Sequence, residues 1–166
     1  MALTRAISLA GAASIGAAAW LVVDRHPRFA GGFALAAAGL LLIAGHRANH
    51  GAGGHPERML DDLLDRGWDG AVLGAIAWAT RGGRPAVAAA ALVALGASFL
   101  SSYVRARGAA LDYSVEESHV TRGLRYGLVS AGLLLARPFW PLCAAAIVSG
   151  VALIVRSSQV LKEERV

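Results

Sequence analysis

The sequence predicts an all-α integral membrane protein with six transmembrane helices. Hydrophobic residues make up 56% of the 166 residues and charged residues only 16%, whereas a soluble domain carries about a quarter. The mean hydropathy is +0.53. Apolar runs long enough to cross a bilayer, roughly 17–25 residues each, can be placed six times. No stretch has the composition of a separate soluble module, so residues 1–166 are expected to form a single membrane domain.

The boundaries of the six spans follow from polar turns and prolines. Pro27, in the first polar turn, is expected to stop the first helix. Pro85 closes a short turn of Arg and Gly residues before the fourth span, and Pro138 ends the fifth. The segment 105–121 is the longest polar connection, and residues 156–166 form a charged tail. The expected spans are residues 6–23, 29–46, 60–80, 86–104, 122–136 and 139–155.

Basic residues are distributed unequally between the two ends of these spans. Six spans place the N-terminus, the segments 47–59 and 105–121, and the C-terminal tail on one side. Eleven of the sixteen Lys and Arg residues lie on that side and five on the other. The positive-inside rule therefore places the richer side in the cytoplasm, and the expected location is the plasma membrane. The basic excess indicates contact with membrane lipids. Nucleic acid is not an expected partner, because no stretch combines dense basic residues with interleaved aromatics.

The third span begins with a row of acids. Asp61, Asp65 and Asp69 are spaced four apart, which places them on roughly one face of a continuous helix. Carboxylates entering a bilayer are costly unless a metal, a bound cation, a water-filled cavity or basic partners compensate them. The alternative, which applies best to Asp62 and Asp69, is a solvated helix start, since acids are favoured at helix N-termini.

The stretch Leu60 to Trp78, with Ser102 to Arg107 after it, resembles the CDP-alcohol phosphatidyltransferases, most closely the actinobacterial branch that makes phosphatidylinositol phosphate. The resemblance is strongest over residues 47–135, and it implies a fold of six transmembrane helices that forms a homodimer. In that family, the signature D-x2-D-G-x2-A-R-x8/9-G-x3-D-x3-D holds a divalent metal, Mg²⁺ or Mn²⁺, at the pyrophosphate of a CDP-linked lipid. The last Asp of the signature acts as general base on the acceptor alcohol.

The resemblance assigns roles to two acids of the row. Asp61 and Asp65 match the third and fourth acids of the signature and their spacing, which makes both of them metal ligands and Asp65 the catalytic base. The positions of the first two acids hold Gly39 and Leu42, so two of the four expected metal-binding carboxylates are missing. Two carboxylates can hold one hydrated Mg²⁺ weakly but hardly a two-metal arrangement.

Three histidines near the acid row offer an alternative metal site. His46 and His50 are four apart, and His55 lies in the following segment. Together with Asp ligands they would suit a softer metal such as Zn²⁺ or Mn²⁺. The other interpretation is three solvated loop histidines, since no ligand spacing here is diagnostic.

Arginines on the same side are the expected binding groups for the substrate. Arg47 falls where the family signature has its Arg, and Arg122 and Arg125 resemble the paired arginines of the family's E-R-x-x-R stretch. The resemblance implies that Arg105, Arg122 and Arg125 together bind the phosphate of the acceptor. A planar guanidinium suits that role because it can meet phosphate with two hydrogen bonds. The alternative is contact with lipid headgroups at the membrane surface.

Two functions follow from these observations. The first is an enzyme of phospholipid biosynthesis, which transfers a phosphatidyl group from CDP-diacylglycerol to an alcohol and releases CMP. The second is a catalytically inactive homologue that keeps the fold and acts as a lipid- or nucleotide-binding partner of an active synthase. The missing acids favour the second, and the catalytic character of the family favours the first. A small transporter would need an acid deeper in another span, and the other spans contain none.

Overall fold

The computed structural model describes residues 2–47, 55–111, 113 and 119–163, and every regular element in these residues is helical. The all-α prediction is confirmed for this part of the chain. The elements are α1 (Ala2–Val23), α2 (Pro27–Arg47), α3 (His55–Trp68), η2 (Asp69–Leu73), α4 (Gly74–Thr80), α5 (Pro85–Ala109), α6 (His119–Leu134) and α7 (Phe139–Glu163).

The elements α3, η2 and α4 follow one another without a break and form one helical rod. Its middle section, η2, is a π-helix, in which the hydrogen bonds span one residue more than in an α-helix. Asp69 is the first residue of η2, so the π-helical turn begins at the last acid of the predicted row. Such turns occur frequently at functional sites, and this one lies within the rod that carries the acid row.

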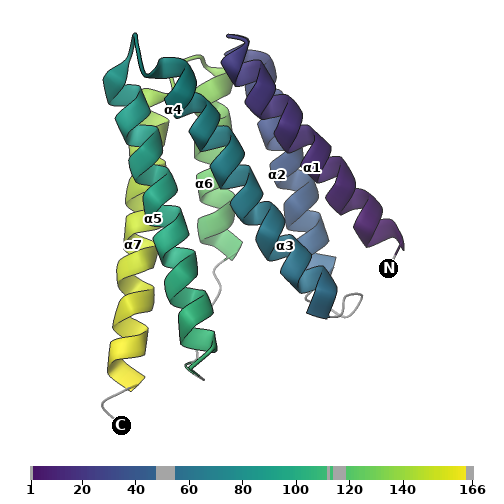
Figure 1. The fold of residues 1–166 in the computed structure, drawn as a ribbon, viewed down its shortest axis with the longest axis vertical. Helices are drawn as coiled ribbons and strands as arrows, with labels where there is room; N and C mark the ends of the chain where they lie inside the picture. Colours follow the sequence, from purple (N-terminus) through teal and green to yellow (C-terminus); the bar gives the residue numbers. More distant parts are fainter. Residues whose placement is uncertain (1, 48–54, 112, 114–118, 164–166) are drawn as a thin grey trace.

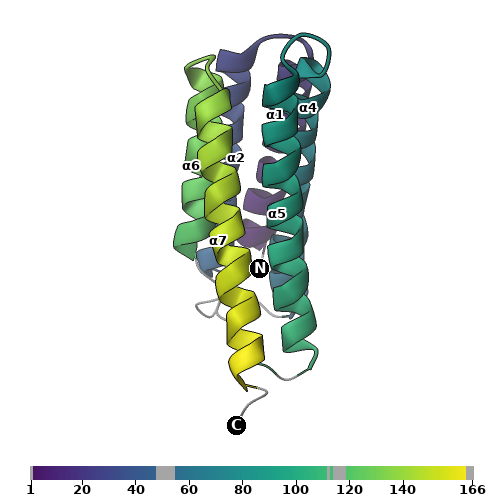
Figure 2. The same cartoon turned by 90° about the vertical axis from the view of Figure 1, so that its left-hand side faces the viewer.

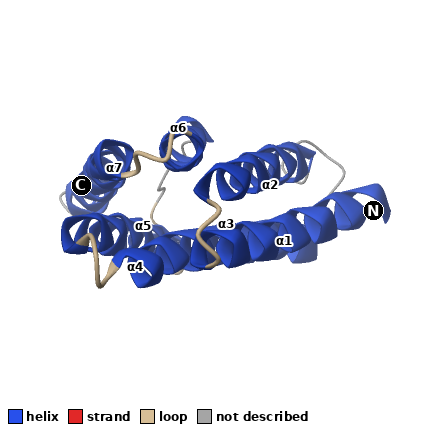
Figure 3. Cartoon of the chain, turned by 90° about the horizontal axis from the view of Figure 1, so that it is seen from above, coloured by secondary structure: helices blue, strands red, loops and turns tan. Residues whose placement is uncertain are grey.

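The helices pack as two layers that lie side by side (Figure 3). One layer holds α2, α6 and α7, and the other holds α1, the α3–α4 rod and α5. Around the bundle, α1 packs on α2, α2 on α6, α6 on α7 and α7 on α5. The rod closes the ring, because α5 packs on α4 and α1 packs on α3 and α4. The acid-bearing rod therefore lies in the layer opposite α6.

The two ends of the bundle differ in what they carry (Figure 1). The short turns between α1 and α2, between α4 and α5, and between α6 and α7 lie together at one end. The start of α1 and the end of α7 point to the other end. Figure 2 shows that α5 and α7 run side by side and extend furthest toward this second end.

Three helix boundaries differ from the sequence-based expectation. Pro27 begins α2 instead of ending α1, because a proline at the first helical position sacrifices no hydrogen bond. Arg105 lies inside α5, which continues to Ala109, and Arg156 lies inside α7, which continues to Glu163. The expected connection and tail are thus partly helical. Arg, Lys, Gln and Glu are good helix formers, so polar composition alone does not end a helix.

Small residues allow α2 to approach α6 closely. A Cβ atom on Gly31 of α2 would lie 2.6 Å from the backbone nitrogen of Leu134 on α6. The neighbouring Gly32 faces open space, with nothing within 4 Å of its Cβ position. The rest of the buried face of α2 consists mainly of alanines. This pattern is typical of helix contacts in lipid, where small side chains let backbones meet.

The apolar helices make the chain a membrane protein. Their surfaces expose large apolar side chains, such as Leu9 at 71% and Ile154 at 70%, which in water would form an unusually large apolar surface. The predicted spans 60–80 and 122–136 correspond to the α3–α4 rod and α6, and their passage through the membrane stays a prediction. Within the described residues, four helices are long and apolar enough to cross a membrane: Leu3–Val23, Pro27–Arg47, Pro85–Ala109 and Phe139–Leu161.

Candidate functional site

The acid row lies on the face of the α3–α4 rod that is turned into the bundle. Asp61, Asp65 and Asp69 are 8%, 2% and 0% exposed, as their spacing predicts for residues on one face. The solvated alternative for Asp69 is therefore wrong, whereas the side chain of Asp62 is half-exposed. Three buried carboxylates need partners, because an unpaired charge in an apolar interior costs on the order of several kcal/mol.

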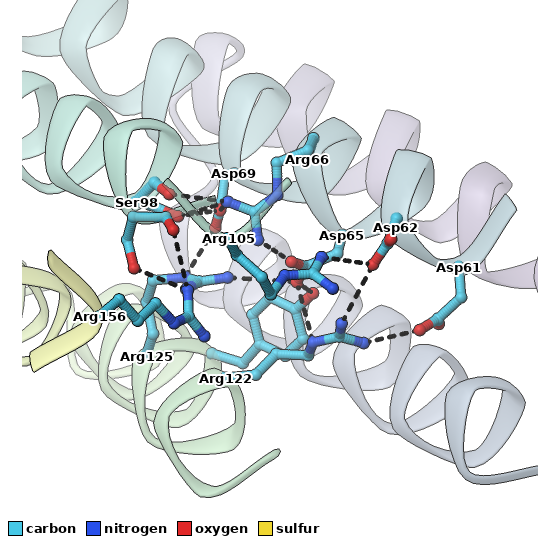
Figure 4. A network of polar contacts seen from close by, with 12 residues as sticks. Asp61, Asp62, Asp65, Arg66, Asp69, Ser98, Arg105, Arg122, Arg125 and Arg156 are labelled. Atoms are coloured by element: carbon cyan, nitrogen blue, oxygen red, sulfur yellow. Dashed lines mark hydrogen bonds and ion pairs between the residues drawn. The ribbon is translucent and has the colours of Figure 1, made fainter. Parts of the chain in front are cut away.

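Two arginines of α6 supply these partners from the facing layer (Figure 4). Arg122 donates from Nη1 to Asp61 Oδ2 at 2.9 Å, and its Nε lies 3.5 Å from Asp65 Oδ1. Arg125 donates from Nε to Asp69 Oδ1 at 2.8 Å and from Nη2 to Asp65 Oδ1 at 3.2 Å. Both arginines are buried. Each therefore bridges two acids, and together they tie α6 to the rod along the whole row.

Arg66 of α3 and Ser98 of α5 complete the surroundings of Asp69. Arg66 Nη1 lies 3.0 Å from Asp69 Oδ2, and the same nitrogen donates to Ser98 Oγ at 2.8 Å. The Ser98 hydroxyl in turn donates to Asp69, and the other terminal nitrogen of Arg66 donates to Asp65. Both oxygens of Asp69 are thus held by donors, which come from α3, α5 and α6.

Tyr126 of α6 and Trp68 of α3 form an aromatic pair that contacts both Asp65 and α2. The Tyr126 hydroxyl donates to Asp65 Oδ1, and the Tyr126 ring lies 4.4 Å from the Trp68 ring, centroid to centroid. The Trp68 indole nitrogen donates to the backbone oxygen of Ala34 on α2 at 3.2 Å. Both aromatic residues are fully buried. This chain of contacts sets the rotation of the rod relative to α2 and α6, and hence the direction of the acids.

Two further arginines surround the outer part of the network. Arg105 of α5 donates to Asp62 Oδ1 at 2.8 Å, and Arg156 of α7 donates to Ser101 Oγ at 2.7 Å. A hollow of about 20 Å³ lies between these helices and is lined by Asp65, five arginines and several serines. A space of that size holds about one water molecule. A larger ligand would enter only if side chains move.

Most residues proposed from the sequence meet in this network. The exception is Arg47, which is exposed at the end of α2 and lies outside the network. The catalytic, metal-binding and substrate-binding roles that the sequence suggests for these residues stay predictions. The residues that the fold brings together from α3, α5 and α6 are Asp61, Asp65, Arg105, Arg122 and Arg125.

Sequence reasoning missed other members of the network, for different reasons. Asp69 carried a signal, because its spacing placed it on the same helix face as Asp65. Arg156 was assigned to a tail, although the helical continuation of α7 brings it to Ser101. Ser98 and Tyr126 gave no local signal, because only the packing of α5 and α6 against the rod brings them to the acids. Asp69 was placed in the acid row without a role of its own, and the missed residues are Arg66, Ser98, Tyr126 and Arg156.

The donor set does not fit the divalent-metal centre that the family resemblance implies. On α2, Gly39 is exposed and Leu42 packs against the apolar core, so neither position supplies a ligand. The α2 residue that lies against the acids is Gly45, where a Cβ atom would be 2.8 Å from Asp61 Oδ2. Among the described residues, no group of three or more His, Cys, Asp or Glu side chains is arranged to hold a metal.

The alternative histidine site is largely beyond the described part of the chain. His46 is exposed at the end of α2. His50 lies outside the described residues, as does the side chain of His55. A mixed site of His and Asp ligands therefore gains no support from the fold.

A larger cavity, of about 510 Å³, lies at the opposite end of the bundle, among the short turns. Its walls include Arg25, Arg81 and Arg84 above an apolar floor that contains Ile76 and Leu133. The cavity shares no residue with the acid network and contains no carboxylate. The chemistry suggested by the sequence therefore belongs to the small polar hollow and not to this larger cavity.

The comparisons with known proteins agree with the fold. No protein-family model and no curated protein sequence matches the chain. The chain is similar to a crystal structure of Mycobacterium tuberculosis phosphatidylinositol phosphate synthase (PgsA1) with CDP-DAG bound, at a TM-score of 0.80 and 21% identity, over 95% of this chain and 85% of that chain. It is also similar to the same synthase in complex with manganese and citrate, at a TM-score of 0.77 and 21% identity, over 95% and 80% of the two chains. The chain therefore has the fold of a CDP-alcohol phosphatidyltransferase of the phosphatidylinositol phosphate synthase type, and the resemblance found in its sequence is confirmed at the level of the fold.

Proposed function

We propose that this protein acts on CDP-diacylglycerol as a CDP-alcohol phosphatidyltransferase of phospholipid biosynthesis. It would transfer the phosphatidyl group to the hydroxyl of an alcohol acceptor and release CMP. The observation that carries the proposal is the position of Asp65, which is 2% exposed and lies among guanidinium groups in a fold shared with a synthase that binds CDP-DAG. Carboxylate and guanidinium groups are the ones that proton abstraction and phosphate binding require.

In this proposal Asp65 is the general base. Its carboxylate would accept the proton of the acceptor hydroxyl as that oxygen attacks the phosphorus of the CDP-linked lipid. Asp65 already accepts hydrogen bonds from Arg66, Arg125 and Tyr126, which hold the carboxylate in one orientation. The acceptor hydroxyl must therefore displace at least one of these donors, so opening of the network is part of the proposed reaction.

The arginines of α5 and α6 form the proposed acceptor site. Arg105, Arg122 and Arg125 approach the hollow from two helices, and a phosphate on the acceptor alcohol would give them a dianion to bind. Their present partners are the acids of the rod. A phosphate would thus compete with the carboxylates for the same donors, which favours an acceptor that carries a phosphate over a neutral alcohol.

A second candidate function is favoured by one observation on α2. Gly39 and Leu42 stand where the resemblance expects acids. The acids that remain form ion pairs with Arg122 and Arg125. A non-catalytic homologue that binds the lipid or its nucleotide and acts as a partner of an active synthase accounts for both features. The two candidates differ in turnover, and they agree in expecting CDP-diacylglycerol to bind.

The deciding experiment measures CMP release from CDP-diacylglycerol by the purified protein with inositol phosphate, glycerol phosphate or serine as acceptor. It is run with EDTA, with added Mg²⁺ and with added Mn²⁺. An Asp65→Asn variant removes the proposed base, and Asp24→Asn, at the opposite end of the bundle, is the matched control. Turnover that is lost in Asp65→Asn and kept in Asp24→Asn supports the enzyme. Binding of CDP-diacylglycerol without CMP release from any acceptor points to the second candidate, and absence of both overturns the proposal.

A further inference from the structure

Each buried acid of the site already has a guanidinium partner among the described residues. The acids are Asp61, Asp62, Asp65 and Asp69, and the arginines that pair with them or line the same hollow are Arg66, Arg105, Arg122, Arg125 and Arg156. The guanidinium groups that already pair with the buried acids repel an added divalent cation and attract an anion, and the effect is strong where water is excluded.

Both oxygens of Asp65 and both oxygens of Asp69 are engaged by nitrogen and hydroxyl donors. Asp65 Oδ1 accepts from Arg125 and Tyr126, and Oδ2 accepts from Arg66. Asp69 Oδ1 accepts from Arg125, and Oδ2 accepts from Ser98. Mg²⁺ or Mn²⁺ would need these oxygens at about 2.0–2.2 Å, the place now taken by the donors. Metal binding would therefore require several charge-assisted hydrogen bonds to break.

The facing surface of α2 adds no ligand that would compensate for this cost. Gly45 lies directly beside Asp61, because a Cβ atom on Gly45 would be 2.8 Å from Asp61 Oδ2. Gly45 has no side chain, and Gly39 and Leu42 carry no carboxylate, so α2 supplies no acidic ligand at these positions.

We propose that arginines replace the divalent cations in this protein: Arg66, Arg122 and Arg125 neutralise the acid row, and the site takes up a phosphate or diphosphate group without metal. The inference deepens the proposed function and rests on it only for the identity of the lipid. Guanidinium groups supply positive charge in fixed directions and can bind phosphate oxygens through two hydrogen bonds. The arginines of the hollow would turn from the acids to the incoming anion, while Tyr126 and Ser98 keep the carboxylates hydrogen-bonded.

The first test uses purified protein in detergent after treatment with EDTA. Electron paramagnetic resonance of free Mn²⁺ measures metal binding, and the melting temperature with and without inorganic pyrophosphate measures anion binding. We expect no uptake of Mn²⁺ at a one-to-one ratio, and a rise of several degrees with pyrophosphate in EDTA that added Mn²⁺ does not increase. Stoichiometric Mn²⁺ binding, or a pyrophosphate effect that is absent in EDTA, would overturn the proposal.

The second test changes the charge of the site. Arg122→Gln removes one positive charge beside Asp61 and Asp65, so we expect the variant to melt at a lower temperature and to regain stability with Mn²⁺. Arg122→Lys keeps the charge and should respond to Mn²⁺ no more than the unmodified chain. Equal responses of the two variants to Mn²⁺ would contradict the replacement of metal by arginine.

CDP-diacylglycerol is tested in parallel so that the two proposals can fail separately. A rise in melting temperature with pyrophosphate but none with CDP-diacylglycerol would leave the metal-free anion site standing and remove the proposed function. Binding of CDP-diacylglycerol only in the presence of Mn²⁺ would leave the proposed function standing and remove the metal-free anion site.

Discussion

The Arg125 Nε atom lies 2.8 Å from Asp69 Oδ1, a contact that joins α6 to the π-helical turn of the rod across 56 residues of sequence. Both side chains are buried, and Asp69 has no exposed surface. Arg125 also reaches Asp65 at 3.2 Å. The Arg125 guanidinium therefore binds two acids of the rod and fixes α6 against it.

Replacing Arg125 by Leu should lower the free energy of unfolding by about 3–5 kcal/mol, because it leaves buried carboxylates short of a partner. Thermal unfolding in detergent measures the effect. The matched control is Arg137→Leu, since Arg137 is exposed at the opposite end of the bundle and should change stability by no more than about 0.5 kcal/mol. Equal losses in the two variants would argue against the ion pair.

Replacing Gly31 by Ala should separate α2 from α6. The added methyl group would lie 2.6 Å from the Leu134 backbone nitrogen and 2.9 Å from the Ser130 backbone oxygen, and neither atom can move without its helix. We expect a loss of roughly 1–3 kcal/mol, as for other overpacked contacts. Gly32→Ala adds the same group to open space and should not destabilise. The pair is compared by melting temperature, and similar values for both variants would mean that α2 and α6 pack less closely.

The sequence predicts the position of the acid row well and its partners poorly. Spacing four apart is a local property of one helix, so the shared face of Asp61, Asp65 and Asp69 follows without knowledge of the fold. Arg122 and Arg125 lie on α6, more than fifty residues away, and no local pattern states which helix packs opposite. The sequence therefore left metal and basic partners as alternatives for the compensating charge, and only the fold brings these arginines to the acids.

Helix ends were harder to predict than helix positions, for a related reason. Pro27 is compatible with either the end or the start of a helix, and only the turn after Val23 decides between them. Arg156 lies in a polar sequence that resembles a tail, yet it donates to Ser101 on α5. The helix α7 thus continues beyond its apolar part and brings Arg156 to α5, and this contact has no signature along the chain.

Replacing Tyr126 by Phe should weaken the site without disturbing the aromatic pair. The variant keeps the ring that packs on Trp68 at 4.4 Å and loses the hydroxyl that donates to Asp65. A hydrogen bond to a charged group contributes about 1.5–3 kcal/mol, and we expect a loss of stability in that range. Tyr103 is 65% exposed, so Tyr103→Phe is the control and should be neutral. Unfolding of both variants in detergent separates a buried hydrogen bond from a general effect of removing a hydroxyl.

The orientation of the bundle gives the last prediction. Eleven basic residues on the side of the chain ends against five on the side of the short turns should keep the first side in the cytoplasm. In a Cys143→Ser background, Gly82→Cys places a thiol in an exposed turn, and Ala109→Cys places one at the exposed end of α5. A membrane-impermeant maleimide should label Gly82→Cys in intact cells and Ala109→Cys only after the cells are opened. The reverse pattern would place the acid network at the outer surface and overturn the predicted orientation.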